Sequence, residues 1–426
     1  MILAVEAVVN LSIIIPALNE ERNVAELIPK LRKVISPISP EYEIIVVDGG
    51  STDDTAATAR ALEAKVTMQK EKGYGGALKE GFCIAQGDYI LTLDGDLSHD
   101  PSFIPDLWRE RAEAEIVVAS RYVTEGSARM PITRRFLSRA LNMFFASGLS
   151  LPLKDLSSGF RLYHAATLRD LELSSSDFDI LQEVVIKCHS QGWHIKEVPF
   201  HYLPRTRGTS HVSLLRFGIS YLSTFMRMWR LRNSTLSADY DDRAFDSIIP
   251  LQRYWQRRRY RIVTEMARGA HATLDVGCGS SRILGGLESG IGVDVQAAKL
   301  RYVRKLGRPL VNASIFALPF RDAAFDCVVC SEVIEHLPPG DEPFDELSRV
   351  LAQGGQLVIG TPDYGGIWWP TIERLYGFFA PGGYAEEHIT RYTRRSLIEL
   401  LERRGLVLQD CRYILRSEMI LLFTKQ

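Results

Sequence analysis

The sequence has no excess of charge of either sign. Its 426 residues include 51 basic and 52 acidic side chains, which leaves a formal net charge of −1. A nearly neutral chain has no global field that would attract nucleic acid, so nucleic acid is disfavoured as a partner. The hydrophobic content of 46% is that of an ordinary globular protein with sizeable cores.

Long apolar runs and clustered cysteines are also lacking. No apolar stretch has the length that spans a bilayer, and residues 1–9 lack the basic start of a signal peptide. Six cysteines are scattered, and the spacing of Cys327 and Cys330 in an apolar run puts them on opposite faces of a strand, as core residues. We therefore expect a protein of the reducing cytoplasm, with two or three domains.

A strand end with two carboxylates is the central feature of the first half. The apolar run 89–93 stops at Asp94, Gly95 and Asp96. A buried strand that presents both acids at its exposed end makes a site for a hard divalent cation, Mg²⁺ or Mn²⁺, whose remaining ligands would be water and a substrate diphosphate. The alternative is a strand followed by an Asp-Gly turn.

Strand and helix patterns alternate before this site. Apolar runs at 11–15 and 43–47 are each followed by a helix pattern, with Asn19 as the expected N-cap of the first helix. This alternation predicts an α/β fold with a parallel sheet and with ligands at the carboxyl ends of the strands. Asp48 and Asp53 follow the second run, where they would accept hydrogen bonds from a ribose or a base; for Asp53 a helix cap is the alternative.

Two other segments leave alternatives open. Glycines at 73–76 precede a helix pattern, and with Lys72 they would admit a diphosphate or serve as ordinary loop. A cluster of arginines in a segment with few acids would bind phosphate through guanidinium forks or form a solvated face. These arginines are Arg121, Arg129, Arg134, Arg135 and Arg139.

Together these motifs resemble the family 2 glycosyltransferases of the GT-A type, in the branch of dolichyl-phosphate mannose synthases and polyprenyl-phosphate glycosyltransferases. The resemblance covers residues 11–232 and rests on six segments: 15–20, 46–53, 75–79, 94–99, 119–122 and 155–161. It implies inverting transfer of a sugar from a nucleoside diphosphate, GDP or UDP, to a polyprenyl (dolichyl or undecaprenyl) phosphate.

The resemblance also implies roles for single residues. The nucleotide sugar would contact Pro16, Ala17, Glu20, Asp48, Asp53 and Gly95. The metal ligands would be Asp94, Asp96 and, through a bridging water, Ser98, which stands where several relatives carry glutamine. The acceptor phosphate would be bound by Arg121, Arg134, Arg135 and Ser138, and the catalytic set would be Asp94, Asp96, Arg121, Arg134 and Arg205. Gly49 replaces a second aspartate of many relatives, which leaves guanine and uracil open.

The acceptor decides whether a base is needed. A phosphate monoester oxygen is anionic at neutral pH and needs no deprotonation, whereas a sugar hydroxyl needs a general base, for which Asp179 and Glu183 are the candidates. In the family resembled, the segment around Arg205 and Arg207 is a mobile loop over the active site. The apolar residues between 215 and 229 fall on one helical face flanked by arginines, which indicates peripheral contact with the cytoplasmic face of a membrane or packing within the protein.

The second half begins after a polar, aperiodic stretch at 233–246. The basic, aromatic run 252–261 would touch anionic lipid or nucleic acid, or form a solvated helix face, which we prefer. We therefore predict domains at 1–232 and 260–426 with a boundary segment at 233–259. A strand pattern then enters a glycine turn at Gly277 and Gly279, and Asp294 ends the next strand, an arrangement typical of sites that bind a ribose; the lack of a third glycine disfavours NAD.

Residues 260–426 resemble the class I S-adenosylmethionine-dependent methyltransferases, which have a Rossmann-like fold. The segments that carry the resemblance are 274–279, Asp294, 317–326 and 330–337. It implies cofactor contacts by Asp275, Gly277, Gly279, Asp294 and Ser314, the last in place of the aspartate that relatives use for adenine. A hydroxyl acceptor would need a base, for which His336 and His388 are candidates; for His336 the alternative is a structural role in the following loop.

The sequence thus predicts a bifunctional α/β enzyme, with a GT-A glycosyltransferase domain followed by a methyltransferase domain. Its cofactors would be Mg²⁺ or Mn²⁺ and S-adenosylmethionine, and the methyl acceptor would be the glycan or lipid product of the same pathway. The alternatives are a polysaccharide glycosyltransferase with a hydroxyl acceptor, and a second half that is a degenerate cofactor-binding module or a nucleic-acid or protein methyltransferase.

Overall fold

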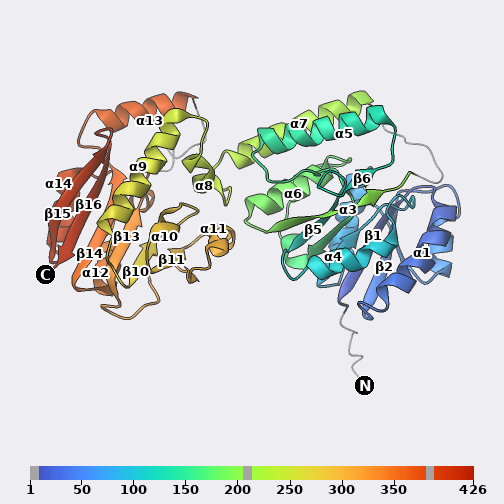
Figure 1. Ribbon diagram of the computed structural model, residues 1–426, viewed down its shortest axis with the longest axis horizontal. Coiled ribbons are helices and arrows are strands. Elements are labelled where there is room, and N and C mark those ends of the chain that lie inside the picture. Colours follow the sequence, from blue (N-terminus) through green and yellow to red (C-terminus); the bar gives the residue numbers. More distant parts are fainter. Residues whose placement is uncertain (1–8, 205–213, 380–387) are drawn as a thin grey trace, which may run out of the picture. The chain divides into compact units, whose positions relative to one another are not determined.

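Figure 1 shows the computed structural model, which describes residues 9–204, 214–379 and 388–426. The chain divides into two compact units: the first comprises Met1–His189 and Trp193–Arg230, and the second comprises Ser190–Gly192 and Leu231–Gln426. Each unit has a sheet flanked by helices, which confirms the prediction of two α/β domains. The predicted boundary segment holds α8 (Tyr240–Phe245) and most of α9 (Pro250–Met266), so it is largely helical; its limits at 233 and 259 stay a prediction.

Within the described residues, the sheet of the first unit has seven strands in the order β3-β2-β1-β4-β7-β5-β8. They are β1 (Leu11–Ala17), β2 (Tyr42–Asp48), β3 (Lys65–Met68), β4 (Tyr89–Thr92), β5 (Ile116–Ser120), β7 (Arg161–His164) and β8 (Ile195–Pro199). β2, β1 and β4 are parallel neighbours, and β7 runs antiparallel to both β4 and β5. The carboxyl ends of β1, β2 and β4 therefore share one edge, at a topological switch point of the kind where such sheets bind ligands.

The helices of the first unit lie on both faces of this sheet. They are α1 (Glu21–Ile35), α2 (Thr55–Ala61), α3 (Tyr74–Ile84), α4 (Ile104–Glu110), α5 (Ile132–Gly148), α6 (Ile180–Ser190) and α7 (Leu214–Arg232), with 3₁₀ turns η1 (Pro101–Phe103) and η2 (Ala165–Thr167). A separate parallel pair is formed by β6 (Ser127–Ala128) and β9 (His201–Tyr202).

The predicted N-cap of the first helix is wrong. The cap residue of α1 is Glu20, and Asn19 instead has a left-handed backbone with φ 57°. Its Oδ1 accepts a hydrogen bond from Thr52 N–H at 2.7 Å. Asn19 therefore ties the loop after β1 to the loop after β2, because a contact across the sheet edge prevails over the local capping preference.

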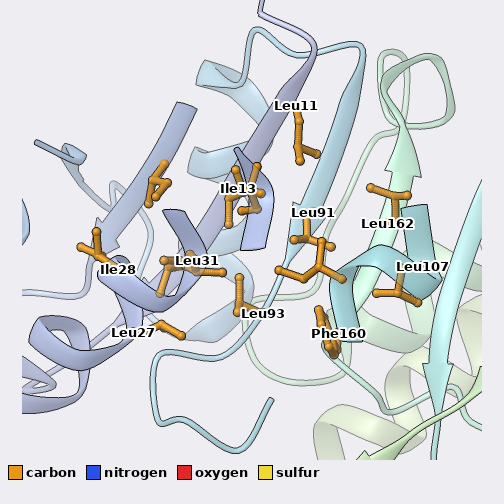
Figure 2. Packing of buried hydrophobic residues seen from close by; sticks show 14 of the residues in the cluster. Leu11, Ile13, Leu27, Ile28, Leu31, Leu91, Leu93, Leu107, Phe160 and Leu162 are labelled. Atoms are coloured by element: carbon orange, nitrogen blue, oxygen red, sulfur yellow. The ribbon is translucent and has the colours of Figure 1, made fainter. Parts of the chain in front are cut away.

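Alternation along β1 separates two hydrophobic layers. Ile13 joins a cluster with Leu27 and Leu31 of α1, which Figure 2 shows turned toward the sheet. Ile14, the next residue, points to the opposite face and packs with Leu78 of α3. Both isoleucines are fully buried, so truncation of either to alanine would cost about 2–5 kcal/mol of folding free energy.

In the second unit, the described strands form a seven-stranded sheet in the order β12-β11-β10-β13-β14-β16-β15. They are β10 (Thr273–Val276), β11 (Gly290–Asp294), β12 (Leu310–Asn312), β13 (Phe325–Ser331), β14 (Leu351–Pro362), β15 (Leu406–Ile414) and β16 (Glu418–Lys425). The first five strands are parallel and β16 is antiparallel to both neighbours. The order reverses between β10 and β13, so the ends of β10, β11 and β13 again share a ligand-binding edge.

The helices of the second unit also cover both faces of its sheet. Besides α8 and α9 they are α10 (Ile283–Gly286), α11 (Ala297–Val303), α12 (Glu342–Val350), α13 (Trp368–Phe379) and α14 (Arg394–Glu402), with 3₁₀ turns η3 (Arg304–Leu306) and η4 (Ile334–His336). Across residues 9–204, 214–379 and 388–426, none of the helices combines the length and the apolar character that a bilayer crossing requires.

Candidate functional site

The loop after β4 holds Asp94 between a tyrosine and a histidine. The hydroxyl of Tyr74 donates to Asp94 Oδ1 at 2.9 Å, and the N–H of Asp94 donates to His99 Nδ1 at 3.0 Å. His99 is buried, and burial lowers its pKa although Asp94 and Asp96 oppose the shift. The neutral ring accepts at Nδ1 and carries its proton on Nε2, 3.9 Å from Asp94 Oδ2. The carboxylate is therefore held in place by the protein alone.

Asp96 and Ser98 occupy the buried side of the same loop. Asp96 Oδ1 accepts from Ser98 N–H at 3.0 Å, and the buried Ser98 hydroxyl has no hydrogen-bond partner among the described residues. Asp94 keeps 25% of its side chain exposed. Two carboxylates and an unpartnered hydroxyl are the oxygen donors that Mg²⁺ and Mn²⁺ prefer, so these residues fit a hard cation. Their assignment as ligands stays a prediction.

The residues predicted to contact the nucleotide sugar line the same edge. A Cβ atom on Gly95 would lie 3.3 Å from the carbonyl oxygen of Pro16, at the end of β1. The N–H of Gly49, just after β2, donates to the carbonyl of Ala17 at 2.8 Å. The structure therefore brings the ends of β1, β2 and β4 together, as the alternating pattern predicts.

The acids beside this edge are engaged in holding its loops. Asp48 is buried and accepts from Ser51 N–H at 3.0 Å. Asp53 accepts from Thr55 N–H at 3.1 Å and from Glu21 N–H at 3.3 Å, which serves the starts of both α2 and α1. Burial opposes the shift, but these hydrogen bonds lower the pKa of Asp53. The N-cap residue of α2 is Asp54, so Asp53 is not itself the cap, although its carboxylate accepts from the first N–H groups of two helices; its contact with a nucleotide stays a prediction.

Glu20 and the glycine segment are also explained by packing. The carboxylate of Glu20 accepts from Asn23 at the start of α1. Gly75 N–H donates to the carbonyl of Ser176 at 2.7 Å, and a Cβ on Gly75 would lie 2.6 Å from that carbonyl carbon. Glycine at this position permits close approach of two backbones. The helix α3 begins at Tyr74, so Gly75 and Gly76 lie in its first turn and not in a loop before it; a contact of this segment with a diphosphate stays a prediction.

Arg121 forms a buried ion pair that the sequence did not reveal. Its Nε and Nη2 donate to the two oxygens of Asp155, both at 2.7 Å, and its Nη2 also donates to Ser157 at 2.8 Å. Burial opposes the shift, but the charge and hydrogen bonds of Arg121 lower the pKa of Asp155. Because its fork is occupied by Asp155, Arg121 is held in a fixed orientation; its role in binding an acceptor phosphate stays a prediction. In the sequence, only the position of Asp155 in the segment 155–161, which supports the resemblance to family 2 glycosyltransferases, indicated that this residue is important.

A cavity of about 570 Å³ opens beside this pair. Its lining combines guanidinium groups with apolar side chains, and no acidic residue is part of it within the described chain. The residues are Arg121, Tyr122, Gly126, Ser127, Ala128, Arg129, Ile132, Arg135, Phe136 and Arg139. Such a lining suits an anionic group that is attached to an apolar body.

The other predicted acceptor residues are placed differently. Ser138 on α5 accepts from the hydroxyl of Tyr122 at 2.8 Å, beside the cavity. Arg134 is exposed on α5 and does not line the cavity, whereas its neighbour Arg135 does. Arg205 lies outside the described residues.

Tyr202 connects the cavity to the Asp94 loop. Its ring centroid lies 6.0 Å from that of His99, and the Arg121 guanidinium lies 5.7 Å from the Tyr202 centroid. The predicted metal site and the arginine-lined cavity are therefore neighbours within the first unit.

Glu183 is unsuited to act as the alternative general base. Its carboxylate accepts from Ser175 N–H at 2.7 Å and pairs with Lys187 at 2.7 Å. Burial opposes the shift, but these contacts lower its pKa to about 2, so it is a very weak base. Asp179 is buried as well and accepts from the Thr224 hydroxyl at 2.7 Å.

In the second unit, the glycine turn faces Asp294. Asp294 Oδ2 accepts from Gly279 N–H at 2.8 Å, and Oδ1 accepts from Gln296 N–H at 2.7 Å. Gly277 has φ 71°, and a Cβ there would lie 2.3 Å from Val333, so only glycine fits. Asp275 is buried with Oδ2 unpartnered in the described residues; burial and the charge of Asp294 raise its pKa to about 7.

Sequence reasoning missed the contribution of α8 to this turn. Asp241 of α8 accepts from the hydroxyl of Ser280 at 3.1 Å and lies 3.3 Å from Lys299 Nζ. Asp241 and Asp242 stand in a polar stretch of the sequence, and no motif there indicates a contact with the glycine turn. Ser314 is half-buried, and its hydroxyl accepts from Phe316 N–H at 3.3 Å in a tight turn; its contact with adenine stays a prediction.

The two histidines predicted as methyl-transfer bases lie together. The ring centroids of His336, in η4, and His388 are 5.1 Å apart. Glu335 lies near both histidines and is fully buried, and its Oε2 accepts from the Thr361 hydroxyl at 3.0 Å. Burial raises the pKa of Glu335.

Comparison with known proteins gives two matching families. The model of glycosyl transferase family 2 matches residues 12–171, and that of a methyltransferase domain matches residues 274–359. A dolichol-phosphate mannosyltransferase from Pyrococcus furiosus is 34% identical over 210 residues, which are 47% of this chain and 58% of that protein. An undecaprenyl-phosphate mannosyltransferase from Micrococcus luteus is 32% identical over 213 residues, which are 47% of this chain and 86% of that protein.

Among solved structures, a glucosyl-3-phosphoglycerate synthase from Mycobacterium tuberculosis is 22% identical, with a TM-score of 0.43 over 52% of this chain and 78% of that one. The chain spans 58% of the archaeal mannosyltransferase and most of the bacterial one. The chain therefore belongs to glycosyltransferase family 2, and it carries a methyltransferase domain after its family 2 domain.

Proposed function

We propose that the first unit transfers a glycosyl group, with inversion, from a nucleoside-diphosphate sugar to the phosphate of a polyprenyl lipid. The observation that carries this proposal is the arginine-lined cavity beside the Asp94 loop. Guanidinium groups bind phosphate in a bidentate manner, and the apolar residues Ile132 and Phe136 at the same cavity suit the start of a prenyl chain.

A phosphate acceptor also agrees with the acids of this unit. Glu183 is held as an anion with a pKa of about 2, so it offers no base for a hydroxyl acceptor. A phosphate oxygen that is already anionic needs none. Transfer then depends on alignment of the two substrates and on neutralisation of the departing nucleotide.

The donor would be bound at the shared edge of β1, β2 and β4. Asp94 and Asp96, with Ser98 through a water, would hold Mg²⁺ or Mn²⁺, which supplies positive charge to the leaving diphosphate. His99 and Tyr74 would act as positioning residues, because both contact Asp94 and neither faces the cavity.

An apolar surface next to the cavity supports contact with a membrane. On α5, Ile132, Phe136 and Leu137 are 76%, 75% and 57% exposed, and on α7, Ile219 and Leu222 are 67% and 59% exposed. The two helices lie side by side in Figure 1, and the rings of Phe144 and Phe225 join them at 4.4 Å. Insertion of this surface into the headgroup region would bring a lipid phosphate to the arginines.

The second unit would transfer a methyl group from S-adenosylmethionine. Asp275, the turn at Gly277 and Gly279, and Asp294 would hold the cofactor, with Ser314 near its adenine. The cofactor supplies an activated methyl group when it is bound. The buried Asp275 with an unpartnered oxygen fits a ligand that brings positive charge or hydrogen-bond donors.

The test is a mass-spectrometric screen of GDP and UDP sugars with the full chain and undecaprenyl or dolichyl phosphate in detergent. We expect one donor to give a lipid monophosphate sugar whose linkage breaks in mild acid and whose phosphate resists phosphatase. Arg135→Ala is expected to raise the KM for lipid phosphate at least about tenfold, since one charge-assisted pair is lost.

Arg109→Ala is the matched control, because Arg109 is an exposed arginine of the same unit outside the cavity. A product that forms only with a sugar hydroxyl acceptor, or a KM that Arg135→Ala leaves unchanged, would contradict the proposal.

A further inference from the structure

Three potential metal ligands converge in the second unit. Glu335 and His336 stand in η4, and His388 approaches them from further along the chain; one ligand atom of each lies within 4.8 Å of the other two. Glu335 Oε1 is buried without a hydrogen-bond partner among the described residues. A buried carboxylate oxygen that lacks a partner is costly, and beside two imidazoles it forms a donor set that a cation would complete.

The surroundings of His388 orient its ring as a ligand. Its Nδ1 lies 3.3 Å from Glu373 Oε1 and 2.9 Å from the hydroxyl of Tyr364, which itself donates to Glu373 at 2.6 Å. An imidazole that donates Nδ1–H to a carboxylate keeps its lone pair on Nε2. This carboxylate–histidine arrangement is the usual second layer around a protein-bound metal. Glu373 is therefore a positioning residue.

The local charge also favours a cation. Glu332 and Glu418 both pair with Arg259, at 2.9 and 2.7 Å. Glu335 adds a third carboxyl group, close enough to interact with Arg259 and Glu418. A divalent ion would restore the balance between acids and cations that one arginine leaves incomplete.

We propose that Glu335, His336 and His388 bind one divalent ion of the Zn²⁺ or Mn²⁺ type. Two ligand atoms that each lie about 2.0–2.2 Å from such an ion are roughly 3.0–3.6 Å from one another. His336 Nε2 and Glu335 Oε1 are 4.0 Å apart. Binding of the ion therefore requires these two atoms to approach by less than about 1 Å. Two histidines and one carboxylate leave coordination positions open, as in catalytic sites.

The place of the ion indicates the class of methyl acceptor. η4 follows Val333, whose side chain packs on Gly277 of the turn that would hold the cofactor. An ion held at this edge would bind an acceptor hydroxyl and lower the pKa of that hydroxyl, so the histidines would serve as ligands and not as bases. This step rests on the proposed methyl transfer and assigns an oxygen acceptor. The acceptor oxygen would form a bond to the methyl carbon as the bond from that carbon to the sulfonium sulfur breaks, which leaves S-adenosylhomocysteine, and the hydroxyl proton would be released to solvent.

The test uses cobalt as a visible probe. The full chain carrying Asp94→Asn and Asp96→Asn, so that the first unit does not compete, is stripped with a chelator and titrated with Co²⁺ without methyl donor. We expect one equivalent to bind with ligand-field absorption typical of nitrogen ligands. His336→Asn or His388→Asn should abolish the band, and Glu373→Gln should weaken binding about 10–100-fold. His271→Asn, at an exposed histidine of the same unit, should change nothing.

The proposal is overturned if the unsubstituted site binds no stoichiometric Co²⁺, or if the absorption survives either histidine substitution. The first outcome needs no variant of the site, so a folding defect cannot obscure it. Since no methyl donor is present, a failure of the proposed methyl transfer would leave this result intact, and the two failures are distinguishable.

Discussion

The two units use the same edge of a doubly wound sheet in opposite ways. In the first unit, the carboxylate of Asp94 is held by the Tyr74 hydroxyl, and Asp155 is paired with Arg121. In the second, Asp275 and Glu335 each keep a buried oxygen that has no hydrogen-bond partner among the described residues, and burial raises the pKa of both. The first unit thus positions Asp94 with a neutral hydroxyl and pairs Asp155 with an arginine, whereas the second leaves an oxygen of Asp275 and of Glu335 without a hydrogen-bond partner among the described residues.

The comparison teaches that topology locates a site and side-chain contacts decide its chemistry. The arginine-lined cavity of the first unit suits an anionic acceptor. The buried acids of the second suit a cofactor with positive charge, and a metal ion. Substitutions that remove one charge should therefore have effects of opposite sign in the two units.

The largest effect is expected at the ion pair of the first unit. Arg121→Ala leaves Asp155 buried without its partner, so the first unit should lose about 3–5 kcal/mol of folding free energy. Arg135→Ala, at an exposed arginine of the same cavity, should change it by less than about 0.5 kcal/mol. Urea unfolding of the full chain, with hydrogen exchange as the readout for each unit, measures the change in folding free energy of both variants. Equal losses would show that Arg121 is not held as described.

Removal of a charge in the second unit should stabilise it. The pKa of Asp275 is raised to about 7 in the folded protein. The stability that its protonated form contributes is therefore complete at pH values below the pKa of Asp275 in the unfolded chain, and it is lost as the pH rises through 7. Asp275→Asn should therefore raise the stability of the second unit by roughly 2–4 kcal/mol near pH 8 and by little near pH 4. Thermal unfolding across this range checks the sign, and a destabilised variant at high pH would contradict it.

The exposed apolar surface of the first unit should matter for membranes and little for folding. Ile219→Gln with Leu222→Gln should weaken binding to phospholipid vesicles at least about tenfold, since each buried side chain contributes about 1.5–3 kcal/mol. Ile248→Gln, at a residue of the second unit that is 93% exposed, is the control. Vesicle sedimentation measures the effect; equal binding by both variants would remove the surface from the account.

The smallest effect is expected at Asp53. Hydrogen bonds lower the pKa of Asp53 in the folded protein. The stability that its carboxylate contributes is therefore present at pH values above the pKa of Asp53 in the unfolded chain, and it is lost as the pH falls. Because the residue is exposed, Asp53→Asn should cost only about 0.5–1 kcal/mol at neutral pH. The wild type and the variant should converge in acid, as they do at Asp275, but at neutral pH Asp53→Asn is the less stable protein, whereas Asp275→Asn is the more stable one. Denaturant midpoints at several pH values would show the trend, and a gap that widens in acid would be inconsistent with it.

The sequence predicted the elements of both sites where local patterns suffice. Apolar runs that end at Asp48, Asp94 and Asp294 indicated strand ends, and the parallel alternation placed them at shared edges. The Arg121–Asp155 pair joins residues that are 34 positions apart, and no local pattern specifies such a partner. The error at Asn19 has the same origin, since a contact with Thr52 from another loop outweighed its capping preference.

The α8 segment shows the same limit. Its polar composition suggested a linker, yet Asp241 joins the glycine turn through Ser280 and Lys299. The grouping of Glu335, His336 and His388 likewise depends on how η4 meets a distant part of the chain. Long-range contacts of this kind follow from the fold, and composition alone does not encode them.

The account depends most directly on the acids after β4. The measurement is the rate of lipid-phosphate glycosylation by the double variant Asp94→Asn, Asp96→Asn, with and without added Mg²⁺ or Mn²⁺, beside Asp100→Asn as the exposed control. We expect the wild type and the control to lose activity on chelation, and the double variant to be slower by at least about 10²–10³-fold with either ion. An undiminished rate in the double variant without added cation would contradict the central claim.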